Sequence, residues 1–127
     1  MRKILIVEDD EDLASILQTA FVARGFSAKA VYDGEEALRE IIIYKPDLVV
    51  LDIMLPKIDG WEVCGSIKSD NDTKNISVVI ITGKTGNQYI EKGKMLGTDK
   101  YFTKPFDMMY FMRFIEDLLM NKKGGCK

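Results

Sequence analysis

Acidic, hydroxyl and amine side chains follow the apolar segments of this sequence at regular intervals. Glu8 and Asp9 come directly after the first apolar segment, and Asp52 ends a later one. Thr82 ends a third such segment, and Lys104 follows a fourth. Carboxylates that lie a few Å apart repel one another and raise each other's proton affinity unless a cation is present. Brought together, side chains of these types could hold a divalent cation and a phosphoryl group.

The segments that must position these side chains alternate between two patterns. Short apolar, β-branched runs predict buried strands, and segments with apolar residues three and four apart predict helices. Such an alternation indicates a parallel sheet covered on both faces, here a five-stranded α/β sandwich. The predicted strands are 3–7, 27–31, 47–52, 76–82 and 100–103, and the predicted helices are 11–25, 33–44, 59–69, 86–96 and 106–121.

In an open α/β sheet, ligands bind outside the carboxyl ends of the strands. The sequence therefore predicts that Glu8, Asp9 and Asp52 meet at one edge, together with Thr82 and Lys104. The implied cation is a hard, oxygen-binding ion such as Mg²⁺, since no histidine or cysteine accompanies these acids. Asp52 is the best candidate for a carboxylate nucleophile that forms an aspartyl phosphate, because it ends a central strand.

The remaining acids of the first cluster and the apolar segment 41–44 receive simpler interpretations. Asp10 is expected to cap the helix that follows, with Glu11 and Asp12 in its first turn. The segment 41–44, Ile-Ile-Ile-Tyr, is expected to lie in the core.

Composition excludes several classes of protein. The chain has 127 residues, 46% of them hydrophobic, and a net charge of −2, which suits one globular domain without a basic nucleic-acid-binding surface. No apolar run is long enough to span a membrane and no signal peptide precedes the first strand, so a cytoplasmic location is expected. The absence of histidine excludes a His-based triad. Cys64 and Cys126 predict neither a disulfide framework nor a metal site.

Four motifs, in order along the chain, resemble the receiver domain of bacterial two-component response regulators. They are "ILIVEDD", "DLVVLDIMLPKIDGWE", "VVIITG" and "DKYFTKPF". The resemblance covers essentially the whole chain, with a receiver domain expected over 1–121 and a short tail over 122–127. It implies a flavodoxin-like (βα)₅ fold with strand order 2-1-3-4-5 and helices on both faces.

The resemblance also implies roles for the acids. Asp52 would accept a phosphoryl group from the phosphohistidine of a sensor histidine kinase or a histidine phosphotransfer protein. Glu8, Asp9 and Asp52 would hold Mg²⁺ (or Mn²⁺), together with the backbone carbonyl of Met54.

For the residues on the other strands, the resemblance implies contacts to the phosphoryl group and a switch. Thr82 would bond a phosphoryl oxygen and Lys104 would pair with the phosphate. The Lys104–Pro105 peptide bond would be cis. Tyr101 would be the switch aromatic, moving inward when Thr82 is drawn to the phosphate.

The last helix is more apolar than packing on a sheet requires. Eleven of the fifteen residues in "FDMMYFMRFIEDLLM" are apolar, whereas one stripe is sufficient. Met109, Tyr110 and Met120 fall off that stripe and are expected to be exposed. Exposed methionine and aromatic residues mark adaptable interfaces, so Met109 and Tyr110, with Tyr101, are predicted to form a phosphorylation-dependent contact for homodimerisation or a partner. The expected stripe is Met108, Phe111, Met112, Ile115, Leu118 and Leu119.

Met54 and Lys84 lie two residues beyond Asp52 and Thr82, where water would approach an acyl phosphate. Neither side chain is suited to activating water, because one is apolar and the other is cationic at neutral pH. The sequence therefore predicts a slowly hydrolysing phosphate.

A signalling switch, rather than a turnover enzyme, is the leading interpretation. A Mg²⁺-dependent phosphatase that acts through an aspartyl phosphate is the alternative, although the chain leaves no room for a substrate-binding cap. No membrane contact, no direct nucleic-acid binding and no effector domain are expected in this chain. The pathway, the cognate kinase and the output are not indicated by the sequence.

Overall fold

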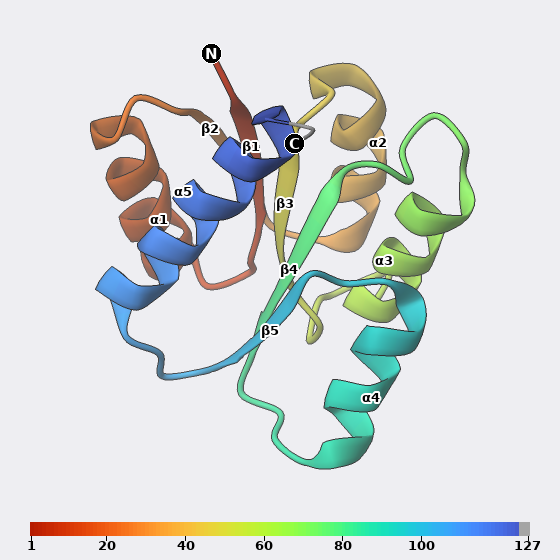
Figure 1. The fold of residues 1–127 in the computed structure, drawn as a ribbon. Helices are drawn as coiled ribbons and strands as arrows, with labels where there is room; N and C mark the ends of the chain where they lie inside the picture. Colours follow the sequence, from red (N-terminus) through yellow and green to blue (C-terminus); the bar gives the residue numbers. More distant parts are fainter. Residues whose placement is uncertain (125–127) are drawn as a thin grey trace.

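The chain folds into a parallel sheet flanked by helices, as a computed structural model that describes residues 1–124 shows (Figure 1). The sheet has five strands in the order β2-β1-β3-β4-β5, and every pairing is parallel. The strands are β1 (Lys3–Val7), β2 (Ser27–Val31), β3 (Leu48–Asp52), β4 (Ser77–Thr82) and β5 (Lys100–Thr103). The helices are α1 (Glu11–Ala23), α2 (Gly34–Tyr44), α3 (Gly60–Ser69), α4 (Asn87–Leu96) and α5 (Met108–Gly124).

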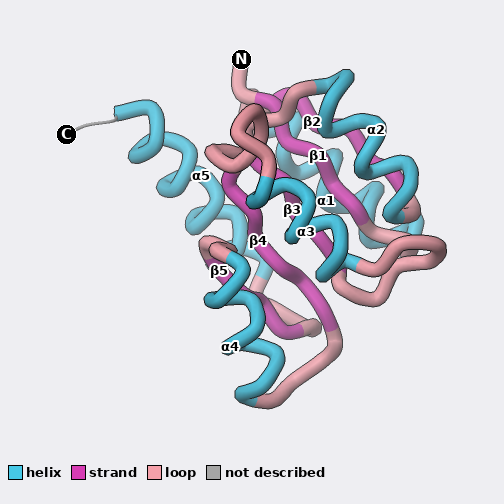
Figure 2. Tube along the Cα trace, turned by 90° about the vertical axis from the view of Figure 1, so that its right-hand side faces the viewer, coloured by secondary structure: helices cyan, strands magenta, loops and turns pink. Residues whose placement is uncertain are grey.

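Two apolar cores lie on opposite faces of the sheet. Alternate strand residues point to opposite faces, so Ile4 and Ile6 pack with the α1 and α5 side chains, whereas Leu5 and Val7 pack with those of α2 and α3. Figures 1 and 2 show this arrangement, with α1 and α5 on one side and α2, α3 and α4 on the other. The predicted strand order and the covering of both faces are therefore confirmed.

Aspartates begin the first three helices. The Asp10 carboxylate accepts hydrogen bonds from the backbone N–H groups of Asp12 and Leu13, which confirms the predicted cap of α1. Asp33 and Asp59 cap α2 and α3 in a similar way, and each accepts one backbone N–H group, that of Glu36 and that of Glu62. Such caps satisfy N–H groups that have no partner within the helix, and they fix where each helix starts after its strand.

The last helix differs at both ends from the segment 106–121 that its periodicity predicts. It begins at Met108, because the Asp107 carboxylate accepts hydrogen bonds from the N–H groups of Met109 and Tyr110 and so acts as its cap. It continues to Gly124, past the expected boundary of the tail. Cys126 lies outside the described residues.

The surface of α5 carries apolar side chains where they are predicted. Met109, Tyr110 and Met120 are exposed, with accessible fractions of 69%, 52% and 71%. The buried side of α5 consists of Phe111, Met112, Ile115 and Leu119.

The prediction for the segment 41–44 is wrong in part. Ile41 is buried, but Ile42 and Ile43 are 69% and 65% exposed. A helix that packs on a sheet buries only one stripe, and consecutive residues lie about 100° apart around the helix. No helix among the residues with described side chains is long and apolar enough to cross a membrane.

Candidate functional site

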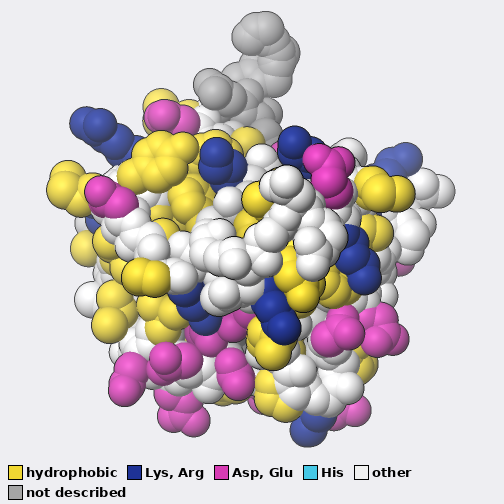
Figure 3. All heavy atoms as spheres, turned by 90° about the horizontal axis from the view of Figure 1, so that it is seen from below, with side chains coloured by type: hydrophobic (Ala, Val, Ile, Leu, Met, Phe, Trp, Pro, Cys, Tyr) yellow, Lys and Arg dark blue, Asp and Glu magenta, His cyan; other side chains and the backbone are white. Residues whose placement is uncertain are grey.

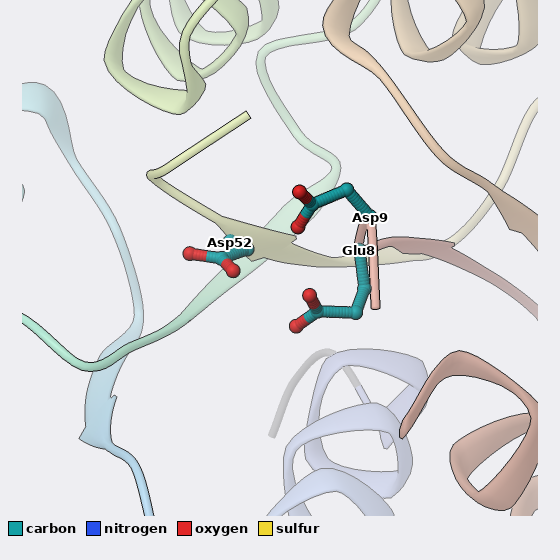
Figure 4. A group of neighbouring side chains, drawn as sticks. All are labelled: Glu8, Asp9 and Asp52. Atoms are coloured by element: carbon teal, nitrogen blue, oxygen red, sulfur yellow. The ribbon is translucent and has the colours of Figure 1, made fainter. Parts of the chain in front are cut away.

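Three carboxylates meet at the carboxyl edge of the sheet. Glu8 and Asp9 follow β1, and Asp52 is the last residue of β3, the strand paired with β1. Each contributes an oxygen that lies within 4.8 Å of the others. Figure 4 shows the three carboxylates pointing into a common space, and in Figure 3 acidic side chains gather on part of this face of the molecule.

Lys104 reaches this cluster from the segment after β5. Its ammonium donates a hydrogen bond of 2.6 Å to Glu8 Oε1 and another of 2.9 Å to Asp52 Oδ2. The Lys104–Pro105 peptide bond is cis. The other oxygen of each acid accepts a backbone N–H group, that of Asp10 for Glu8 and that of Met54 for Asp52. Four of the five side chains predicted at this edge are therefore together.

The cluster is short of positive charge. Glu8 is 1% exposed, and this burial, reinforced by the charge of Asp52, raises the pKa of its carboxyl to about 7 despite the hydrogen bond from Lys104. For Lys104, burial favours the neutral amine, but the bonds to Glu8 and Asp52 outweigh it and raise the pKa of the ammonium. Among the described residues, Lys104 supplies the ammonium in contact with these acids, so carboxylates remain in excess.

A divalent cation would supply the missing charge. Mg²⁺ is a hard cation that prefers oxygen ligands, carboxylates among them. The three carboxylates each offer one oxygen, and these oxygens lie within 4.8 Å of one another, so they could serve one cation together. The type, spacing and excess charge of these residues therefore fit a hard cation.

Thr82, the fifth predicted residue, ends the strand next to that of Asp52 and is linked to Tyr101 through one residue. Asp52 is paired with Ile81 in the sheet, so Thr82 is one position further along β4. Its buried hydroxyl accepts a 3.3 Å hydrogen bond from the Lys84 N–H, while the Tyr101 hydroxyl donates a 2.9 Å bond to the Lys84 carbonyl. The backbone of Lys84 thus contacts both residues assigned to the switch.

A hollow of about 460 Å³ adjoins the acids. Trp61 and Tyr89 form part of its wall, and the ammonium groups of Lys92 and Lys84 lie over their rings at 5.2 and 5.7 Å. This wall could not be predicted from the sequence, because Trp61 is typical of a packing residue and Tyr89 belongs to a different helix. The lining residues are Asp9, Ile53, Met54, Leu55, Pro56, Asp59, Trp61, Lys84 and Tyr89.

Comparison with protein families identifies the family to which this fold belongs. The model of the response regulator receiver domain matches residues 4–116. The chain belongs to this family. The receiver domain predicted from the four motifs is confirmed, and the comparisons do not support the phosphatase alternative.

Curated relatives of this receiver domain include proteins named as transcriptional regulatory proteins. The transcriptional regulatory protein RprY of Bacteroides fragilis is 36% identical over 96% of this chain and 51% of its own length. The alkaline phosphatase synthesis transcriptional regulatory protein PhoP of Bacillus subtilis is 40% identical over 83% of this chain and 43% of its own length. The chain thus spans about half the length of these relatives.

Solved structures of receiver domains superpose closely on this one. The signal receiver domain of a DNA-binding response regulator from Colwellia psychrerythraea is 32% identical, with a TM-score of 0.87 over 94% of this chain and 99% of that chain. The receiver domain of a signal transduction histidine kinase from Syntrophus aciditrophicus is 28% identical, with a TM-score of 0.89 over 98% of this chain and 94% of that chain.

Proposed function

We propose that this receiver domain accepts a phosphoryl group on Asp52 from the phosphohistidine of a sensor kinase or a phosphotransfer protein. The observation that carries the proposal is the convergence of Asp52 with two further acids and the Lys104 ammonium at one sheet edge. The chain contains no histidine, so the donor imidazole comes from the partner.

The transfer uses one oxygen of Asp52 as the nucleophile. An O–P bond forms, the N–P bond of the phosphohistidine breaks, and its electron pair returns to the imidazole nitrogen, which takes a proton. The Lys104 ammonium, already 2.9 Å from Asp52 Oδ2, lies close enough to neutralise a phosphoryl oxygen. The Thr82 hydroxyl, which lies one residue beyond the partner of Asp52 in the sheet, would bond another.

Mg²⁺ (or Mn²⁺) is the proposed cofactor. Glu8, Asp9, Asp52 and the Met54 carbonyl would hold it, and when bound it neutralises charge on the phosphoryl oxygens. The excess of carboxylates over ammonium groups at the site supports this assignment.

The proposed switch starts at Thr82. When the Thr82 hydroxyl turns to the phosphoryl group, the Lys84 N–H loses its acceptor. The same residue holds the Tyr101 hydroxyl, so the change reaches β5 and shifts the balance between two arrangements of the α4–β5–α5 surface.

The phosphoryl transfer is tested with acetyl phosphate as a small-molecule donor. Intact mass should increase by one phosphoryl group in the presence of Mg²⁺, and chelation with EDTA should prevent the increase. A mass that never changes, with inorganic phosphate released from many phosphate esters, would instead show a turnover enzyme.

The output of this receiver domain is proposed to be transcriptional. The matched relatives RprY and PhoP are transcriptional regulatory proteins by name, and the matched receiver region is about half of each. By this similarity, the phosphorylated receiver would control a DNA-binding region of the whole protein.

The exposed part of α5 is the proposed contact surface of the phosphorylated domain. The double substitution Met109→Glu and Tyr110→Glu should reduce phosphorylation-dependent self-association or partner binding at least tenfold, because both apolar side chains would be replaced by charges. Sedimentation of the domain with and without acetyl phosphate measures self-association. Ile42→Glu plus Ile43→Glu, on exposed side chains of α2, is the matched control. Association that survives the α5 substitutions but not the control would contradict the assignment.

The acyl phosphate is expected to hydrolyse slowly. Met54 is 55% exposed beside the acids and has no group to orient water. Met54→Asn would add such a group, and one hydrogen bond to the attacking water, about 1 kcal/mol, shortens the phosphate lifetime roughly fivefold. The decay of the phosphorylated species, followed by mass, measures this lifetime. Met54→Leu should leave it unchanged, and equal lifetimes in all three proteins would refute the hypothesis.

A further inference from the structure

The segment between Asp52 and α3 contains two very tight turns. The Leu55 N–H donates to the Ile53 carbonyl at 3.0 Å, and the Ile58 N–H donates to the Pro56 carbonyl at 2.9 Å. Each bond spans only two residues, which defines a γ-turn. Lys57, at the centre of the second, has φ of +69°. A residue with a Cβ atom rarely adopts this left-handed conformation, so surrounding contacts must stabilise it.

The amino-terminal end of α2 provides those contacts. The Gly34 N–H donates to the Pro56 carbonyl at 3.3 Å. A Cβ atom on Gly34 would lie 2.0 Å from the Ile58 carbonyl oxygen and 2.8 Å from its carbonyl carbon, so no side chain fits there without displacing the backbone of the turn. Only glycine lets the two backbones approach this closely.

Asp33 joins the start of α2 to the same turn. Its Oδ1 accepts the Glu36 N–H at 2.8 Å and so caps α2, while its Oδ2 lies 3.5 Å from the Lys57 ammonium. Glu35 lies 3.6 Å from that ammonium as well. One carboxylate therefore serves both as the helix cap and as a partner of the residue in the left-handed conformation.

The other side of the segment is fixed to the site itself. The Met54 N–H donates to Asp52 Oδ1 at 3.0 Å, and the Gly60 N–H donates to the Ile53 carbonyl at 2.8 Å. A Cβ atom on Gly60 would lie 2.4 Å from the Asp52 carbonyl oxygen. The position of Met54 thus depends on two close backbone contacts, one at the start of α2 and one at the start of α3.

We infer that Asp33 and Gly34 are positioning residues for the metal site: they hold the segment 53–59 against α2 and thereby fix the Met54 carbonyl. The inference rests on the proposed function, in which that carbonyl is a metal ligand. Neither residue touches the acids; both act through the turn at Lys57.

Gly34→Ala tests the inference through Mg²⁺ binding alone. Trp61, the sole tryptophan of the chain, lines the same hollow as Met54 and Asp9, so its fluorescence can report a Mg²⁺ titration without any phosphoryl donor. Outer-shell partners of metal ligands typically contribute 10–100-fold to metal affinity, and the Mg²⁺ dissociation constant should rise by about tenfold or more. Gly65→Ala is the matched control, because a Cβ atom on Gly65, also helical, meets nothing within 4 Å.

Circular dichroism of the same samples separates positioning from loss of fold. A folded Gly34→Ala protein with wild-type Mg²⁺ affinity would overturn the inference. A wild-type protein that binds no Mg²⁺ would overturn the proposed metal site instead, and a weakened Gly34→Ala beside an unaffected Gly65→Ala supports the inference.

If Gly34→Ala does not fold, Asp33→Asn tests the positioning role instead. Asparagine caps helices as well as aspartate, but it removes the charge that faces Lys57. The Mg²⁺ dissociation constant should then rise by only about threefold, because the contact that is lost involves the largely exposed Lys57 ammonium and is weak in water. Asp107→Asn, the same change at the cap of α5, should leave the affinity unchanged. Equal affinities in both variants would overturn the inference.

Discussion

Replacement of Asp52 with asparagine is expected to abolish the phosphoryl adduct completely while the domain remains folded. An amide is not a nucleophile toward phosphorus, and no other carboxylate of the cluster ends a central strand. The Asn oxygen can still accept the Met54 N–H as Asp52 Oδ1 does. Lys104 would lose one of its two acceptors but keep the 2.6 Å bond to Glu8, and Glu8 would lose the repulsion of a neighbouring negative charge.

Intact mass after incubation with acetyl phosphate and Mg²⁺ measures the effect. Asp72→Asn, a change of the same kind in the exposed loop after α3, should be phosphorylated like the wild type. Thermal melting of Asp52→Asn should show a cooperative transition at or above the wild-type temperature. An adduct of undiminished yield on Asp52→Asn would place the phosphoryl group on another residue and contradict the proposal.

Replacement of Lys104 with methionine should destabilise the metal-free protein strongly. Glu8 and Asp52 have side chains only 1% and 5% exposed, and Lys104 is paired with both. Removal of one partner from a buried ion pair typically costs 3–5 kcal/mol. Because the Lys104 side chain is itself 26% exposed, water can replace part of its contribution, and we expect roughly 2–3 kcal/mol.

The size of this loss should depend on pH through Glu8. The pKa of Glu8 is raised from 4.5 to about 7 in the folded protein, chiefly by burial. A carboxyl whose pKa is higher when folded stabilises the protein fully below its unfolded pKa, and this contribution is lost as the pH rises through the folded value. Without Lys104, which lowers the pKa of Glu8, that pKa would rise further.

Lys104→Met should therefore melt much lower than the wild type near pH 8 and much closer to it near pH 5. Denaturation in EDTA at both pH values, repeated with Mg²⁺, measures this difference, and Mg²⁺ should restore part of the loss near pH 8. Lys74→Met, at an exposed site after α3, provides the control. An equal loss at both pH values would show that the effect does not arise from unneutralised carboxylates.

The gathering of the acids could be predicted from the sequence because it follows from the strands. Residues 4–7 and 48–51 are apolar throughout and buried, and parallel strands bring their carboxyl ends to one edge. The strand pattern is therefore sufficient to predict that Glu8, Asp9 and Asp52 lie at one edge of the sheet. The capping role of Asp10 could also be predicted, because it depends only on the next three residues of the chain.

Features that depend on contacts between distant segments could not be predicted in the same way. The left-handed conformation of Lys57 cannot be predicted from its residue type, because lysine rarely adopts it. The turn at Lys57 is held by contacts with the start of α2, more than twenty residues earlier in the chain. The wall of the hollow joins Trp61 of α3 to Tyr89 of α4. The exposure of Ile42 and Ile43 depends on which side of the helix they occupy, and apolarity alone does not indicate this.

The two hydrogen bonds on Lys84 separate two properties of the switch. Thr82 and Tyr101 bind its N–H and its carbonyl, whereas its side chain lines the hollow where water would approach the phosphate. In the proposed mechanism, a substitution at position 84 would change how long a signal persists without disconnecting the phosphate from the surface that reads it. Proline would be the exception, since it has no N–H to give to Thr82. The proposed switch therefore lets the side chain of position 84 set signal duration while its backbone carries signal transmission.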